Sequence, residues 1–195
     1  YLITYQTYNF NLAISYYLIT ETIYLGFIFL VLRKNGYRHW FIKKCGGEKK
    51  GYLAYEGLIG FLFFNNAVSI GYIASSTPGN LFSFIGKEFL FTIAAILFII
   101  GFVIKIWATK VVSIDIYYWK DMFLGRKISK FVVTGPYKYF SNLMYGIGHL
   151  QAYAIAIFYG SLYGLIIAFV NQFLIFSFYY FVEKKFIKRI YEKKS

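Results

Sequence analysis

The chain is organised as long runs of apolar residues separated by shorter polar segments. Each run is near the length of about 20 residues that a helix needs to cross about 30 Å of hydrocarbon. Apolar and polar positions do not alternate within the runs, which favours helices over the strands of a membrane barrel. The predicted crossings are residues 11–32, 52–74, 88–108, 142–159 and 161–182. The pattern therefore predicts an all-α membrane protein with about five transmembrane helices, the last two forming a C-terminal helical hairpin.

Composition narrows the class of protein further. Of the 195 residues, 59% are apolar, 24% are aromatic and only 15% are charged. Soluble domains carry roughly 25% charged residues and disordered chains contain few aromatic ones, so both classes are excluded. Five crossings leave room for a single integral-membrane domain over residues 1–195. Cys45 is the single cysteine and no Cys/His pattern has zinc-site spacing, so no metal is expected.

Positive charge is confined to three segments of the chain. The formal net charge is +13, and 19 of the 21 basic residues fall within residues 33–51, 110–141 and 183–195. With five crossings, the positive-inside rule places the N-terminus outside and the C-terminus on the cytoplasmic or matrix side. Lysines beside apolar spans are explained by topology and by attraction to anionic membrane lipid, so no nucleic-acid partner is expected. Residues 110–141 are predicted to lie at the membrane interface, and residues 183–195 form a basic tail.

A charged residue inside an expected crossing is energetically expensive, which makes Glu21 and Lys105 candidates for function. Glu21 lies in the middle of the first span, and we expect it either to pair with a polar group of another helix or to line a cavity. Lys105 lies near the inner end of the third span, so its ammonium can reach the interface, and it is also a candidate for binding substrate. The amides Asn65, Asn66, Asn171 and Gln172 are expected to bond between helices.

Polar residues also recur in the predicted fourth span. Asn142, Tyr145 and His149 are spaced by three and four residues, which places them on one face if this span is helical. A histidine in an apolar helix either forms a hydrogen bond in the core or takes part in chemistry. The first role is the more common one, and the polar neighbours on this face add weight to the second.

The residues before and after the predicted hairpin carry a recognisable pattern. The stretch 131–146 contains Gly135-Pro136-Tyr137 and ends in Ser141-Asn142-Leu143-Met144-Tyr145, and Glu183 closes the last span. This arrangement resembles the integral-membrane methyltransferases that include isoprenylcysteine carboxyl methyltransferase and the phospholipid N-methyltransferases. In that family a Gly-x-Tyr-x-x-x-Arg-His-Pro-x-Tyr motif precedes a helical hairpin, and Glu-Glu follows it. This chain diverges at the Arg-His-Pro motif, where it has Ser-Asn-Leu, and has lysine at the second Glu position.

The resemblance covers roughly residues 101–191 and implies S-adenosylmethionine as cofactor. It implies that a lipid or lipidated, prenylcysteine-type acceptor receives the methyl group. The cofactor-binding residues would be Gly135, Tyr137, Asn142, Tyr145 and Glu183. His149, Lys105 and Trp107 would bind the acceptor, since Lys105-Ile106-Trp107-Ala108 resembles the family's ending of the preceding span. Methyl transfer depends mainly on alignment of the reacting atoms, so few catalytic side chains are required.

Three other functions are compatible with parts of the pattern. The Ser-Asn-Leu replacement also fits a non-catalytic structural or lipid-binding subunit of a membrane complex that retains the methyltransferase fold. The Ser141 to Tyr145 segment loosely resembles steroid-reductase-type membrane enzymes, which would use NADPH. A small channel or transporter would account for Glu21. Partner subunits are expected only under the first of these alternatives.

Overall fold

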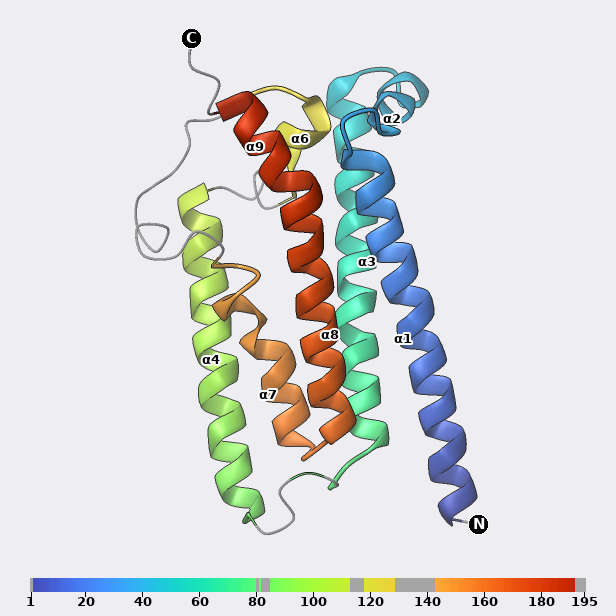
Figure 1. Ribbon diagram of the computed structural model, residues 1–195, viewed down its shortest axis with the longest axis vertical. Coiled ribbons are helices and arrows are strands. Elements are labelled where there is room, and N and C mark those ends of the chain that lie inside the picture. Colours follow the sequence, from blue (N-terminus) through green and yellow to red (C-terminus); the bar gives the residue numbers. More distant parts are fainter. Residues whose placement is uncertain (1, 80, 82–84, 113–117, 129–142, 192–195) are drawn as a thin grey trace.

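The computed structural model describes residues 2–79, 81, 85–112, 118–128 and 143–191. In this part of the chain all regular structure is helical, which confirms the predicted all-α class (Figure 1). The elements are α1 (Leu2–Leu32), α2 (Arg38–Lys44), α3 (Glu48–Ser76), α4 (Lys87–Val112), α6 (Lys120–Leu124), the 3₁₀ turn η2 (Ile147–His149), α7 (Leu150–Phe158), α8 (Leu162–Phe178), the π-helical turn η3 (Tyr179–Glu183) and α9 (Lys184–Tyr191).

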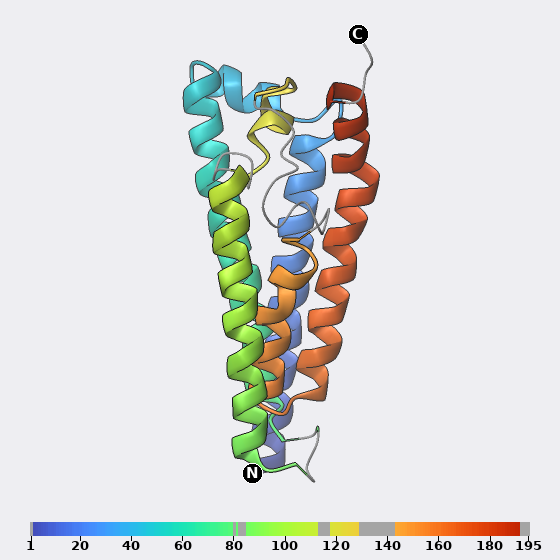
Figure 2. The same cartoon turned by 90° about the vertical axis from the view of Figure 1, so that its left-hand side faces the viewer.

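Four long helices run side by side along the long axis of the molecule (Figures 1 and 2). The segments 9–32, 48–76, 87–112 and 162–191 are long and apolar enough to cross a membrane. Helix α1 packs against α3, α4 packs against α7, and α8 contacts both α3 and α7. The apolar runs of the sequence therefore form a bundle of membrane-spanning length, with many large apolar side chains on its outer faces.

The expected fourth crossing, residues 142–159, is shorter than predicted. Its described part becomes helical only at Ile147, and the apolar helical stretch ends at Phe158. The carbonyls of Tyr145 and Gly146 accept hydrogen bonds from the Gln172 side chain at 2.8 and 3.3 Å instead of entering a regular helix. The predicted turn at residues 159–161 is confirmed, with Gly160 in the left-handed region at φ 59° between α7 and α8.

The basic segments gather at one end of the bundle. Helix α2, the beginning of α3, helix α6 and helix α9 lie together at the end opposite to the start of α1 (Figure 1). Residues 33–51, 118–128 and 183–191, which belong to the three basic segments, therefore meet there. The other end holds the end of α3, the beginning of α4 and the α7–α8 turn. We call the first of these the basic end.

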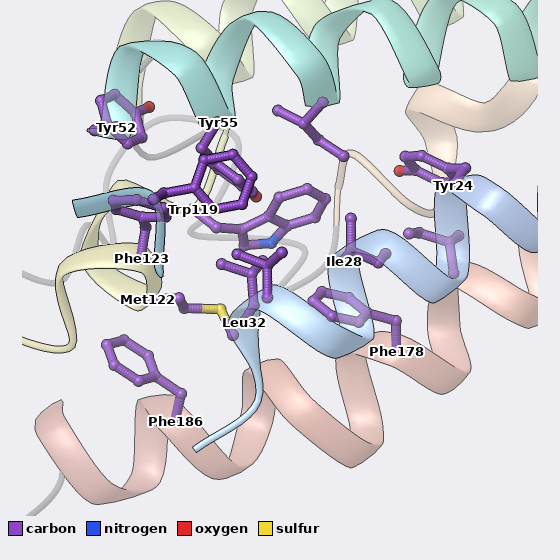
Figure 3. Packing of buried hydrophobic residues seen from close by; sticks show 14 residues of the cluster. Tyr24, Ile28, Leu32, Tyr52, Tyr55, Trp119, Met122, Phe123, Phe178 and Phe186 are labelled. Carbon is purple, nitrogen blue, oxygen red and sulfur yellow. The ribbon is translucent and has the colours of Figure 1, made fainter. Parts of the chain in front are cut away.

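The largest apolar cluster lies just beneath the basic end (Figure 3). It combines side chains from α1, α3, α6, α8 and α9, so it joins elements from both halves of the chain. Trp119, immediately before α6, lies in its middle, with Tyr55 of α3 on one side and Phe178 of α8 on the other. The rings of Trp119 and Phe178 meet edge to face at 5.3 Å between centroids. This packing fixes α6 against the transmembrane helices.

A close helix contact at the opposite end gives a test of the packing. A Cβ added to Gly164 of α8 would lie 2.9 Å from Ala74 Cβ and 3.0 Å from Ala156 Cβ. Overpacking of this kind lowers stability by about 1–3 kcal/mol. We therefore expect Gly164→Ala to lower the melting temperature of the detergent-solubilised protein. Gly57→Ala is the control, because nothing lies within 4 Å of that Cβ. Equal melting temperatures for the two variants would contradict the close packing of α8.

Candidate functional site

Three side chains from distant parts of the chain meet at the end of the last span. Glu183 Oε2 accepts a hydrogen bond from the Tyr145 hydroxyl at 2.6 Å and another from Trp119 Nε1 at 3.1 Å. Trp119 Nε1 is also 3.1 Å from the Tyr145 hydroxyl oxygen. Among the described residues, the hydrogen bonds of the carboxylate come from these two uncharged donors, and no lysine or arginine forms an ion pair with it. Two uncharged donors therefore orient the carboxyl group, and no described cation pairs with it.

The backbone places each of the three groups in an irregular position. Glu183 ends the π-helical turn η3, a rare geometry that recurs at functional sites. Tyr145 lies in a turn whose carbonyl is held by Gln172. Trp119 has φ 56°, the only left-handed non-glycine residue among those described, a conformation that costs about 1–2 kcal/mol for an L-residue. This strained turn directs the indole into the core.

Helix α6, which follows Trp119, is tied to its surroundings at several points. The Asp121 carboxylate accepts a hydrogen bond from the Tyr191 hydroxyl of α9 at 3.1 Å, and burial raises the pKa of this carboxyl above its ordinary value. Arg38 of α2 donates to the carbonyl of Met122 at 3.2 Å. These contacts hold the loop that carries Trp119 in a fixed position.

A cavity of about 400 Å³ lies next to this group and extends into the bundle. Its volume falls within the range of roughly 300–1,000 Å³ that is typical of small-molecule sites. Most of the lining is apolar, and Tyr145 and Trp119 form part of it. The polar side chains of the lining, apart from aromatic residues, are Asn66, Lys105, His149, Gln151 and Asn171. An apolar cavity with a few polar groups suits an amphiphilic ligand.

Lys105 and His149 bring ionisable nitrogens into the cavity. The Lys105 ammonium lies over the Phe63 ring, 5.4 Å from its centroid, and no carboxylate of the described residues pairs with it. His149 Nε2 is 3.0 Å from the carbonyl oxygen of Ala168. Since a carbonyl only accepts hydrogen bonds, we assign the proton of the neutral ring to Nε2. That tautomer leaves Nδ1 as a free acceptor.

A buried polar cluster stands behind another part of the cavity wall. Glu21 of α1, which is only 5% exposed, accepts hydrogen bonds at Oε2 from the side-chain amides of Asn66 and Asn171. Asn171 Nδ2 also donates to Asn66 Oδ1 at 2.9 Å. Both amides line the cavity, whereas Glu21 Oε1 is buried without a hydrogen-bond partner. The interhelical pairing expected of Glu21 is therefore present, and it joins α1, α3 and α8.

The structure brings together some of the predicted site residues and separates others. Tyr145 and Glu183 are in direct contact, and Tyr145, His149 and Lys105 all line the cavity. Trp107 does not line it, and this residue is 45% exposed on the outer face of α4. The cavity therefore gives no support to a substrate contact through Trp107. The other predicted residues, Gly135, Tyr137 and Asn142, lie outside the described part of the chain.

Trp119 is the site residue that sequence reasoning missed. It belongs to the segment 110–141, which was expected to lie at the membrane interface and in which only Gly135 and Tyr137 were predicted as site residues. A tryptophan in an apolar chain is an ordinary interface residue, and no spacing rule relates it to Glu183, 64 positions further on. The aromatic run at residues 117–119 next to Asp121 was the one available signal.

Comparison with known proteins gives the same family. Residues 89–194, more than half of the chain, match the phospholipid methyltransferase family. A phosphatidylethanolamine N-methyltransferase B of Dictyostelium discoideum is 25% identical over 91% of both chains. A phosphatidylethanolamine N-methyltransferase 1 of Vanderwaltozyma polyspora is 32% identical over 64% of this chain but only 14% of its own length. A phosphatidylethanolamine N-methyltransferase of Eremothecium gossypii is 32% identical over 45% of this chain and 10% of its own length.

No solved structure matches the chain. The match covers about a tenth of the length of the Eremothecium relative and about a seventh of the length of the Vanderwaltozyma relative. Most of each of these two relatives therefore has no equivalent in this chain. The family match includes Tyr145, Glu183 and most of α4. It therefore covers the cavity-lining residues that belong to the C-terminal half of the chain. With its multi-pass helical architecture, the chain belongs to the phospholipid methyltransferase family, and it is a lipid methyltransferase-like membrane protein.

Proposed function

We propose that this protein transfers a methyl group from S-adenosylmethionine to the amine of a phosphatidylethanolamine-type lipid. The observation that carries the proposal is the Glu183 carboxylate, which is held by Tyr145 and Trp119 beside an apolar cavity and lacks a cationic partner among the described residues. The names of the relatives support a phosphatidylethanolamine acceptor over a prenylcysteine one.

The residues around Glu183 fit the chemistry of this cofactor. The amino-acid end of S-adenosylmethionine carries an ammonium, and a carboxylate oriented by two neutral donors is a suitable acceptor for it. Tyr145 and Trp119 would help to hold the cofactor through their rings at the cavity wall. When bound, the cofactor supplies a methyl group activated by a sulfonium. The basic end would face the cytoplasm or matrix, which is the side from which a water-soluble cofactor arrives.

The cavity also offers groups for the acceptor lipid. The lipid ammonium has no lone pair, so it must lose a proton before its nitrogen can form a bond to carbon. His149 Nδ1 is the available acceptor for that proton, because Nε2 is bonded to the Ala168 carbonyl. The apolar lining would accommodate the part of the lipid next to the headgroup. These residues bind the acceptor, orient it and take up its proton.

Methyl transfer can be measured directly with the purified protein. Incubation with methyl-labelled S-adenosylmethionine and phosphatidylethanolamine vesicles is expected to yield labelled phosphatidyl-N-methylethanolamine. A farnesylcysteine analogue offered in parallel is expected to remain unlabelled. Label in the farnesylcysteine alone would overturn the assignment of the acceptor. Cofactor binding without label in either lipid would favour a non-catalytic lipid-binding protein.

A further inference from the structure

Glu21 is a buried acidic residue that the proposed reaction does not use. Its side chain lies at the middle of the α1 span. Buried charges in proteins are normally paired with an opposite charge or coordinate a cation, because an isolated charge is costly inside a membrane. Lys105 lines the neighbouring cavity, but its ammonium lies over the Phe63 ring, and no ion pair joins Glu21 to a cation among the described residues. The charge of Glu21 must therefore be balanced in another way.

The hydrogen bonds around Glu21 do not suit a proton as the balancing charge. Oε2 accepts from the side-chain amides of Asn66 and Asn171, so a proton on this oxygen would face two N–H donors. Oε1 is buried without a hydrogen-bond partner, so a proton there would be a buried donor with no acceptor among the described residues. A metal cation needs only acceptor oxygens, and Oε1 is one that no other group uses.

Other oxygen atoms of the same cluster can contribute to a cation site. Asn171 Nδ2 donates to Asn66 Oδ1 at 2.9 Å, which holds the two amides side by side. Asn66 Oδ1 keeps a second lone pair, and Asn171 Oδ1 accepts no hydrogen bond from a described residue. Both asparagines line the cavity, so a small ion and its water ligands can reach them from there. Carboxylate and amide oxygens are the ligands that hard cations prefer.

The charge of the cluster selects a small monovalent ion. Glu21 supplies a single negative charge, and a divalent ion would leave a net positive charge inside the bundle. Among the described residues, no group of three or more histidine, cysteine, aspartate or glutamate side chains could hold a metal ion, so no site of higher charge is available. A carboxylate oxygen exerts a strong field, which favours Na⁺ over the larger K⁺.

We propose that Glu21, Asn66 and Asn171 form a sodium site that joins α1, α3 and α8. The ion is bound by Glu21 Oε1 and the two amide oxygens, and water from the cavity completes its coordination. Because each protein ligand belongs to a different helix, bound Na⁺ stabilises the bundle. The site does not depend on methyl transfer. The sequence-based expectation of no metal came from the spacing of cysteine and histidine, which gives no information about oxygen ligands from three helices.

Thermal stability in defined salts tests the site without cofactor or lipid substrate. The detergent-solubilised protein would be melted in choline chloride and in mixtures where NaCl or KCl replaces it at constant ionic strength. We expect a saturable rise in melting temperature with Na⁺, of about 3–6 °C at ten times the dissociation constant, because the ion binds only the folded chain. K⁺ should give a smaller shift. Equal melting temperatures in all three salts would overturn the proposal.

Two variants separate ion binding from the joining of helices. Glu21→Gln removes the charge but keeps an oxygen that can accept from both amides. It should bind no radioactive sodium, lose the sodium-dependent shift, and melt close to the sodium-free wild type, because it removes an unpaired buried charge. Asn65→Leu is the matched control, because Asn65 of α3 accepts from the Tyr16 hydroxyl of α1 at 2.8 Å but is not part of the cluster. It should keep the full sodium-dependent shift.

Each remaining outcome also decides the proposal. A folded Glu21→Gln protein that keeps the sodium-dependent shift would place the ion elsewhere and refute the site. If this variant does not fold, Asn171→Ala should bind radioactive sodium about tenfold more weakly than the wild type, as expected for the loss of one contact to a charged group. A melting temperature that depends on pH but not on Na⁺ would show that a proton balances Glu21 and would refute the sodium site. A protein that binds Na⁺ but transfers no methyl group would refute the proposed function alone.

Discussion

Glu183→Gln is expected to reduce kcat/KM for S-adenosylmethionine by at least about 30-fold, which corresponds to about 2 kcal/mol. The substitution keeps the length of the side chain and an oxygen that can accept from Tyr145 and Trp119, so the local packing should persist. It removes the negative charge that we assign to the cofactor's ammonium. The loss should therefore appear as weaker cofactor binding in titration calorimetry, with the melting temperature of the free protein nearly unchanged.

A matched acidic residue provides the control for Glu183. Glu88 lies in the first turn of α4 at the opposite end of the bundle and is exposed. Glu88→Gln should leave cofactor binding and turnover at wild-type values. Trp119→Phe should have a cofactor affinity between those of Glu88→Gln and Glu183→Gln, because it removes one donor to the carboxylate but leaves the carboxylate itself. Cofactor affinity that is equal in the wild type and Glu183→Gln would show that this carboxylate does not receive the ammonium.

The membrane bundle could be predicted because hydrophobicity acts over long segments. A run of about 20 apolar residues has few alternatives to a transmembrane helix, and the boundaries of the first three spans lie within a few residues of α1, α3 and α4 when the interfacial ends are set aside. The clustering of the basic segments at one end also follows from the sequence. The three segments follow the first, third and fifth predicted spans, and these three spans all end on the same side of the membrane.

The shortened fourth span could not be predicted from hydrophobicity alone. Residues 142–159 are mostly apolar, but the backbone at Tyr145 and Gly146 is bound by Gln172 from the neighbouring helix. Such a contact depends on how α8 packs, and single-sequence periodicity carries no information about it. The spacing of Tyr145 and His149 predicted that the two residues share one helix face. They do line the same cavity, but not because they lie on one helix, since Tyr145 precedes the helical segment.

Only some of the residues of the candidate site could be predicted from the sequence. Tyr145 and Glu183 entered through the resemblance to a family, whose motif fixes their order along the chain. Trp119 depends on a left-handed turn, and the Glu21 cluster depends on three helices meeting. Asn66 and Asn171 had the properties of ordinary interhelical amides, and their additional position at the cavity wall emerges only from the packing.

His149→Ala is expected to lower kcat for methyl transfer by at least about 100-fold, the lower end of the effect of removing a general base. The KM for lipid should change much less, because the apolar lining of the cavity is the larger part of the proposed lipid contact. The variant's rate should recover partly at high pH, since a larger fraction of the lipid amine is then already neutral. Initial rates with labelled cofactor over a range of pH values would show both effects.

The control uses the second histidine of the chain. His39 lies in α2 at the exposed basic end and is not part of the cavity lining, so His39→Ala should have the turnover and pH profile of the wild type. A structural role for His149, through its bond to the Ala168 carbonyl, would lower the melting temperature and reduce the rate equally at every pH. Recovery confined to high pH distinguishes proton uptake at Nδ1 from that role, because only proton transfer is relieved when the amine arrives unprotonated.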